Sequence, residues 1–431
     1  MTSQPQPPNT RVQRTRSSPS APRSPLTRSP LGRREVAMRV MAYLCVAAGS
    51  ACSTAGRSAG EVSRSSGREL NRPPRIRGRP FGFAQDGFPR RVASLALIAG
   101  LVCPVAMAGE SRTVTDIVAN GDVRLAATLD LPNGRGPHPV VVVLHASGAG
   151  ERGFAAYRHL AEVLPSHGIG VARYDRRGSG ASTGDFERAS FSDLASDVRT
   201  VLRWVRGFDS VDPGRIGLWA MSQGGWIAPL VAAEDPKIAA MVIVSGAGTT
   251  PAEQMIFTAR TALREAGYSA EIIEEAVRLR RAVDDYYAGT RKREDVARIL
   301  ASARAEPWYA LTSLPTELPR DITSSKWYYQ FAFDPAGSIA KTKAPVLLLF
   351  AERDPWISMD QSMAAWKTCA SGKLTVRKIA GTNHFMAETT DPGRDSSPEP
   401  VSAEYSRVMI EWLVRTLGTA TPTDPRPARR C

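Results

Sequence analysis

From residue 109 onward, short apolar runs alternate with amphipathic segments, and this alternation limits the fold more than any other feature of the sequence. Runs such as PVVVVL are continuously apolar, which is typical of strands buried on both faces of a parallel sheet. Segments with helical spacing separate them. The pattern predicts an α/β fold, with a mostly parallel, doubly wound sheet of about eight strands. The expected strands are 124–132, 139–147, 170–175, 215–222, 239–248, 344–354 and 373–381, and the expected helices are 153–168, 191–208, 224–235, 358–370 and 400–418.

The interval 250–340 breaks this rhythm. Its first part, 253–289, has apolar residues at helical spacing, with Gly267 as the expected break, and no run in the interval is as apolar as the strands. We therefore expect an α-helical lid inserted into a core made of 109–249 and 341–418. Seven aromatic residues are expected to form the core of this lid or, alternatively, to line an acyl pocket: Trp308, Tyr309, Trp327, Tyr328, Tyr329, Phe331 and Phe333.

The basic charge of the chain lies almost entirely upstream of this core. Residues 1–108 contain 17 Arg, no Lys and four acidic residues, out of a formal net charge of +14 for the whole chain. The Pro-, Ser- and Arg-rich extension 1–91 is expected to be disordered, as is the tail 419–431. Because the rest of the chain is nearly neutral, we expect no nucleic-acid partner.

A secretory signal is expected just before the core. A pair of arginines precedes an apolar run of 16 residues, 92–107, and Ala106-Met107-Ala108 offers a small-x-small cleavage site. This pattern predicts a signal peptide at 92–108, and the run is shorter than the ~20 residues of a membrane-spanning helix. We expect translation to start near the beginning of this run, with 38–52 as a rival signal. The mature protein would begin at Gly109 and be exported, either periplasmic or secreted.

The segment AMSQGGW follows the apolar run RIGLW and precedes an apolar helix. A strand-to-helix turn this tight holds its central residue in a strained conformation and needs small residues two before and two after it. Ala220 and Gly224 meet that demand, which makes Ser222 the candidate nucleophile. Taken alone, a serine before two glycines is more often structural, so the assignment depends on its partners.

Two candidate partners follow later strands. Asp354 comes after APVLLLF, and His384 comes after KLTVRKIAG and is the only histidine downstream of Ser222. The order Ser, Asp, His is that of an α/β-hydrolase triad, in which imidazole takes the serine proton and a carboxylate orients the imidazole. Glu352 and Asp360 are alternatives for the acid.

An oxyanion hole would complete this chemistry, because charge develops on the carbonyl oxygen during attack. One donor is expected to be the backbone N–H of Gln223, at the start of the new helix. The other is expected in the loop after PVVVVL, at the N–H of Ser147, with Ala146 or Gly148 as alternatives. His145 is expected to order this loop rather than to act as a second base. We expect no metal and no organic cofactor.

Five segments together carry a family resemblance: LHASGAGER, RYDRRGSGASTG, AMSQGGWIAP, LLLFAERD and GTNHF. Over residues 113–418 the chain resembles the α/β-hydrolase superfamily, and within it the bacterial dienelactone-hydrolase and serine-aminopeptidase-like group. It departs from the usual pattern at Ala146 and Ala220, where that group usually has glycine. The resemblance implies the α/β-hydrolase fold and a hydrolase that acts on a small-molecule ester or a short peptide.

Several alternatives stay open at this point. Ester cleavage is the main hypothesis, a peptidase or amidase is the second, and a non-catalytic binding protein on this fold is the third. An acidic residue near the lid that could hold a substrate amine, such as Glu306 or Asp321, would favour an aminopeptidase. The charged run 175–177 is expected to form an internal ion pair with a solvated neighbour, with recognition of a substrate carboxylate as the alternative.

Overall fold

The computed structural model describes residues 112–369, 372–388 and 400–418. The predicted extension 1–91, the signal peptide 92–108 and the tail 419–431 fall outside these ranges. Among the described residues, no helix combines the length and the apolar character needed to cross a membrane.

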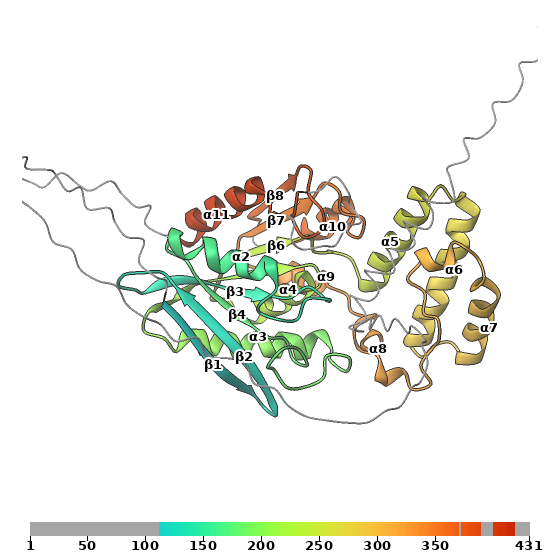
Figure 1. Cartoon of the computed structure of the whole chain (residues 1–431), viewed down its shortest axis with the longest axis horizontal. Helices are drawn as coiled ribbons and strands as arrows, with labels where there is room; N and C mark the ends of the chain where they lie inside the picture. Colours follow the sequence, from blue (N-terminus) through green and yellow to red (C-terminus); the bar gives the residue numbers. More distant parts are fainter. Residues whose placement is uncertain (1–111, 370–371, 389–399, 419–431) are drawn as a thin grey trace, which may run out of the picture.

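Eight strands form one sheet in the order β1-β2-β4-β3-β5-β6-β7-β8 (Figure 1). The pairs β1–β2 and β2–β4 are antiparallel, and every pair from β4 to β8 is parallel. This confirms the predicted mostly parallel α/β sheet. The strands are β1 (Arg112–Asn120), β2 (Val123–Leu131), β3 (His138–Leu144), β4 (Gly170–Tyr174), β5 (Val211–Met221), β6 (Ile238–Val244), β7 (Val346–Ala351) and β8 (Leu374–Ile379).

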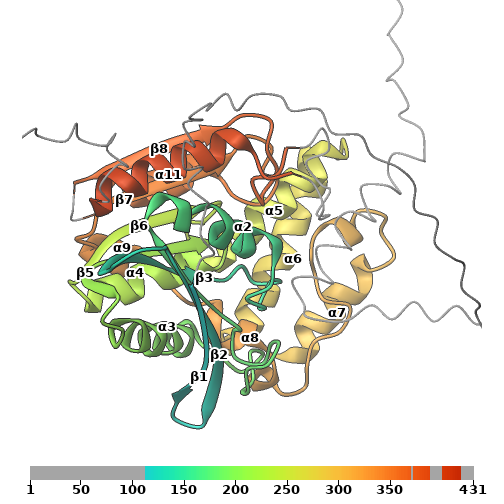
Figure 2. The same cartoon turned by 60° about the vertical axis from the view of Figure 1, so that its left-hand side comes forward.

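Helices cover both faces of this sheet (Figure 2). Along β3, Val140 packs on one side and Val141 on the other, and both are fully buried. The sequence is continuously apolar there because both faces of the strand need apolar side chains, each contributing about 1.5–3 kcal/mol when buried. One face carries α2 (Ala155–Val163) and α11 (Ala403–Leu417), and the other carries α3 (Phe191–Arg206), α4 (Gly224–Glu234), α9 (Ala336–Lys341) and α10 (Met359–Trp366).

Between β6 and β7 the described chain is helical and contains no strand. The predicted break at Gly267 is confirmed, since this residue has a φ of +78° and separates two helices. These helices have a hydrophobic core of their own, and Figure 1 shows α5, α6 and α7 grouped beside the sheet rather than on its faces. The helices are α5 (Pro251–Glu265), α6 (Ala270–Tyr287), α7 (Arg293–Ala303) and α8 (Lys326–Gln330), and short 3₁₀ turns occupy Pro165–His167, Tyr309–Leu311 and Ile322–Ser324.

Candidate active site

Ser222 occupies a strained turn directly after β5. Its φ is +52°, a conformation that residues other than glycine rarely adopt and that costs about 1–3 kcal/mol. The turn is held because the N–H of Ser222 donates to the carbonyl of Val244 at 2.9 Å. A Cβ on Gly224 would lie 2.9 Å from the carbonyl oxygen of Leu144, so this position accepts only glycine without a backbone shift. The turn therefore has the strain and the close backbone approach that the sequence motif predicts.

His384 and Asp354 are in direct contact. Nδ1 of His384 lies 2.8 Å from Oδ2 of Asp354, and both side chains are almost completely buried. Oδ1 of Asp354 accepts the N–H groups of Trp356 and Ile357 at 2.9 and 3.2 Å, which fixes the carboxylate. A carboxylate at Nδ1 selects the tautomer with its proton on that nitrogen. Nε2 is then left with a lone pair, as a general base requires.

The two alternative acids do not contact this histidine. Glu352 is exposed, pairs with Lys378 and accepts the N–H of Gly381. Asp360 is exposed in the first turn of α10. Of the three carboxylates, Asp354 is the one placed against His384.

Ser222 reaches the same edge of the sheet as this pair. The strands β5, β7 and β8 are parallel, so the loops after them lie at one edge. Ile357, three residues after Asp354, lines the same cavity as Ser222. Among the described contacts, no hydrogen bond joins Ser222 to His384, and that contact stays a prediction. Catalytic hydrogen bonds of this kind often tighten only when a substrate is bound.

The loop after β3 is fixed by two side chains that the sequence did not single out for this role. The hydroxyl of Tyr157 accepts the N–H of Ala146 at 2.8 Å and donates to the carbonyl of Ala149 at 2.9 Å. Nη1 of Arg176 donates to the carbonyls of Ala146 and Ser147 at 3.1 and 2.8 Å. Helical spacing predicted that Tyr157 lies in a helix, but no local signal links it to this loop.

These contacts bear on the choice among the oxyanion donors. The N–H of Ala146 is occupied by a hydrogen bond, so this alternative is disfavoured. Ser147 and Gln223 line the cavity that contains Ser222, whereas Gly148 lines a neighbouring depression. Ser147 lines both hollows, and its N–H stays the predicted second donor.

The surroundings of His145 agree with the expected role in ordering the loop. Its Nε2 lies 2.6 Å from the carbonyl oxygen of Tyr174. Burial, helped by the nearby positive charge of Arg176, lowers the pKa of His145 to about 3. The ring is therefore neutral near pH 7 and serves as a fixed hydrogen-bonding group.

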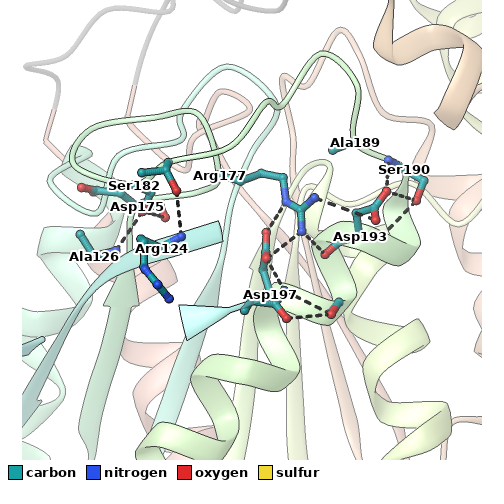
Figure 3. A network of polar contacts seen from close by, with 12 residues as sticks. Arg124, Ala126, Asp175, Arg177, Ser182, Ala189, Ser190, Asp193 and Asp197 are labelled. Carbon is teal, nitrogen blue, oxygen red and sulfur yellow. Dashed lines mark hydrogen bonds and ion pairs between the residues drawn. The ribbon is translucent and has the colours of Figure 1, made fainter. Parts of the chain in front are cut away.

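The charged run 175–177 does not form the expected internal ion pair. Asp175 pairs with Arg152 at 2.6 Å, and Arg177 pairs with Asp197 at 2.6 Å. Figure 3 shows the second pair, where the guanidinium joins the loop after β4 to helix α3. The prediction was wrong because the partners come from distant segments, which a local sequence pattern does not reveal.

A cavity of about 320 Å³ lies over Ser222. Its walls come from the core and from the helical insertion, and they are mostly apolar. Gln223 joins the two parts, since its Nε2 donates to Oε1 of Gln330 at 3.0 Å. Among the described residues that line it, Arg280 is the only charged one.

The aromatic residues of the insertion lie in different places, some in its core and some elsewhere. Trp327 lines the cavity, whereas Trp308 and Tyr309 are buried in the insertion's own core. Tyr328 is exposed, and Phe333 packs against Phe191 of α3, with ring centroids 5.0 Å apart. The core reading therefore holds for Trp308 and Tyr309, and an acyl pocket lined by Trp327 stays a prediction.

Glu306 and Asp321 are not part of the cavity wall. Both are exposed, and Asp321 accepts the N–H of Thr323 at the start of a 3₁₀ turn. The acidic group that would favour an aminopeptidase is therefore not supplied by either residue.

Residues 120–384 match the family model described as X-Pro dipeptidyl-peptidase (S15 family). The match covers more than half of the chain and includes Ser222, Asp354 and His384. The chain belongs to the S15 family. Membership in S15, together with the observed sheet, confirms the α/β-hydrolase prediction, and makes the protein a hydrolase that acts on ester or peptide bonds.

This S15 member is also similar to individual proteins of known sequence or structure. An uncharacterized 31.7 kDa protein from the traX-finO intergenic region of Escherichia coli is 23% identical over 267 residues, which cover 61% of this chain and 88% of that protein. Esterase EstD of Thermotoga maritima is 22% identical over 318 residues, 71% of this chain and 68% of that protein. The solved structure of Est1E from Butyrivibrio proteoclasticus with bound ferulic acid is 17% identical, with a TM-score of 0.47 over 70% of this chain and all of that one.

Proposed function

We propose that the protein is a serine hydrolase that cleaves carboxylic esters through Ser222, His384 and Asp354. The observation that carries the ester reading is the cavity over Ser222, which is mostly apolar and has no carboxylate among its described lining residues to hold a substrate amine. The strained turn at Ser222 and the buried contact between His384 and Asp354 support the triad. The relative named Esterase EstD supports an ester substrate.

In the proposed reaction, Ser222 attacks the ester carbonyl while Nε2 of His384 takes its proton. Asp354, held by two backbone N–H groups, keeps the imidazole in the required tautomer and stabilises the imidazolium. The backbone N–H groups of Gln223 and Ser147 bind the oxyanion. His384 then gives its proton to the leaving alcohol, and a water molecule, activated by His384, hydrolyses the acyl-enzyme and restores Ser222.

A peptidase or amidase with the same residues is the second candidate. It is favoured by the name of the matching family, X-Pro dipeptidyl-peptidase, because amide and ester cleavage pass through the same kind of tetrahedral intermediate. The two candidates differ in what the cavity must hold. An N-terminal amine would need a carboxylate near it, whereas the charged residue in this wall is Arg280.

Parallel rate measurements separate these candidates. The full chain is assayed on p-nitrophenyl esters of increasing acyl length, on aminoacyl p-nitroanilides and on X-Pro p-nitroanilides, each with wild type and Ser222→Ala. We expect ester cleavage that depends on Ser222 and little release from the anilides. Higher kcat/KM on an X-Pro anilide than on every ester would replace the ester proposal with the peptidase.

We also propose that 250–340 acts as a lid over the core formed by 109–249 and 341–418. Residues of α5, α6 and α8 form one side of the cavity, so their movement would open or close it. Limited proteolysis tests this, since cuts within the lid should slow after a phosphonate ester occupies Ser222. Unchanged cutting would argue against a mobile lid.

Export to the periplasm or the medium is part of the same proposal. It is supported by the signal-peptide pattern at 92–108. N-terminal sequencing of the protein made in its host should give a mature chain that begins at Gly109. A mature chain that begins before residue 90 would contradict this proposal.

A further inference from the structure

Arg280 stands out in the cavity because it is a charge in an otherwise uncharged wall. It lies on α6, is only 3% exposed, and lines the same cavity as Ser222. Its guanidinium lies 4.8 Å from the centre of the Phe331 ring. Burying a cation is costly unless its N–H groups are used, so the partners of this side chain indicate what it does.

The partners found for Arg280 use three of its five N–H groups. Nε and Nη2 both contact Oδ1 of Asp284 at 2.8 Å, and Nη1 reaches the carbonyl of Ser313 at 3.3 Å, a long hydrogen bond. Among the described residues, no acceptor engages the two remaining N–H groups, one on each terminal nitrogen. Asp284 holds the guanidinium edge formed by Nε and Nη2, and it is not among the residues that line the cavity.

Ser313 adds a second, independent feature at the same place. It has a φ of +57°, although it is not glycine, and it too lines the cavity. Its hydroxyl is buried and has no hydrogen-bond partner among the described residues. A strained residue with an unsatisfied hydroxyl, beside a cation with unused donors, is typical of a ligand site rather than of a packed core.

The hydrogen-bonding groups of Arg280 and Ser313 favour one class of ligand. The unused groups are two N–H groups of the positively charged Arg280 guanidinium and the Ser313 hydroxyl, which can also donate. A planar carboxylate matches a guanidinium edge, and charge-assisted hydrogen bonds of this kind are strong. In the part of the chain that the structure describes, no carboxylate lines the cavity and competes for this edge.

We propose that Arg280 and Ser313 bind a free carboxylate on the substrate, so that the preferred substrates are esters of a dicarboxylic acid with one carboxyl group left free. The free carboxylate contacts Arg280 and Ser313 while the ester carbonyl lies at Ser222. The inference rests on the proposed ester function and adds the substrate class to it.

The experiment compares two chromogenic esters that differ only at the far end of the acyl chain. One is the mono-p-nitrophenyl ester of adipic acid, and the other is the neutral ester in which an isopropyl group replaces the free carboxylate. Succinate and glutarate monoesters vary the distance between the two ends. We expect wild type to cleave one of the monoesters with a kcat/KM at least about tenfold above that of its neutral counterpart.

Arg280→Gln should lower this carboxylate preference by about 10- to 100-fold, mainly through KM for the anionic ester. Because that variant leaves Asp284 without its partner, the double variant Arg280→Met with Asp284→Leu provides a second test without a buried unpaired carboxylate. The matched control is Arg260→Gln, which breaks the pair with Glu274 on the outside of the same helical insertion and should leave the preference unchanged.

The outcomes separate this inference from the proposed function. A wild-type ratio near one for all three monoesters, or a ratio that survives both Arg280 variants, overturns the carboxylate site while ester cleavage stands. If neither ester is cleaved and a fluorophosphonate does not label Ser222, the proposed function fails and this inference falls with it.

Discussion

The cavity over Ser222 has two sides that are built in different ways. On the core side the features that set the geometry are in the backbone: the strained turn that holds Ser222 and the close approach at Gly224. On the insertion side they are side chains on helices, such as Arg280 and Trp327. A rigid sheet can hold backbone groups to the accuracy that catalysis needs, whereas helix side chains are easily exchanged. If the proposed function holds, we expect the reaction chemistry to belong to the core and substrate choice to the insertion.

Asp354→Asn is the change expected to have the largest effect. An amide at this position would favour the wrong imidazole tautomer, so we expect kcat to fall about 10⁴-fold on every substrate. The matched control is Asp360→Asn, which changes an exposed carboxylate near the same strand. A loss that differs strongly between anionic and neutral esters would contradict the assignment of chemistry to the core.

Tyr157→Phe tests the support of the loop after β3, which is proposed to supply one oxyanion donor. Without the hydroxyl, the N–H of Ala146 and the carbonyl of Ala149 lose their shared partner. We expect kcat to fall about 10- to 100-fold with little change in KM, because misplacing a donor affects the transition state. Tyr405→Phe removes another buried hydroxyl, the one that accepts from Nε1 of Trp219, and should leave kcat unchanged. Equal kinetics for the two variants would sink this role for Tyr157.

Gly224→Ala tests the close approach behind the nucleophile. The new Cβ would lie 2.9 Å from the carbonyl oxygen of Leu144, so the turn must shift. We expect the free energy of unfolding to fall by about 1–3 kcal/mol, measured by urea titration, together with loss of activity. Gly337→Ala, in helix α9 with no atom within 4 Å of the new Cβ, should leave stability unchanged or raised. An unaffected Gly224→Ala variant would show that the turn is not constrained.

His145→Gln tests a smaller, pH-dependent contribution from the core side. The folded-state pKa of His145 is lowered to about 3 by burial, against an unfolded value near 6.5. Between these pH values the unfolded chain binds the extra proton, so this contribution to stability is complete above pH 6.5 and is lost as the pH falls. The difference in unfolding free energy between wild type and His145→Gln should shrink from pH 7 to pH 4. A constant difference would mean that His145 titrates normally.

Much of the core side could be predicted from the sequence because its signals are local. Short, mainly apolar runs identified seven of the eight strands, and the spacing around Ser222 identified the turn. The strand β1 was missed because it lies at the sheet edge and is mostly exposed, so its sequence RTVTDIVAN lacks such a run. Local patterns succeed where burial on both faces or backbone strain dictates the residue type.

The sequence did not predict which side chains of the insertion face the cavity. Arg280 lies in a helical stretch whose periodicity gave no sign that one arginine faces a cavity, and Ser313 has no motif around it. The partners of Asp175 and Arg177 were also missed, since each comes from a segment distant in sequence. Contacts between distant segments depend on tertiary packing, and no spacing rule within one chain encodes them.

The central claim is that Ser222 is an activated nucleophile, and covalent trapping tests it most directly. The folded full chain is treated with a fluorophosphonate, digested, and the modified residue located by mass spectrometry, with Ser222→Ala and His384→Gln treated in parallel. The account predicts one adduct on Ser222, none on Ser222→Ala and much slower labelling of His384→Gln. Absence of an adduct on the wild type, as expected for a non-catalytic binding protein, or an adduct that persists in Ser222→Ala, would contradict it.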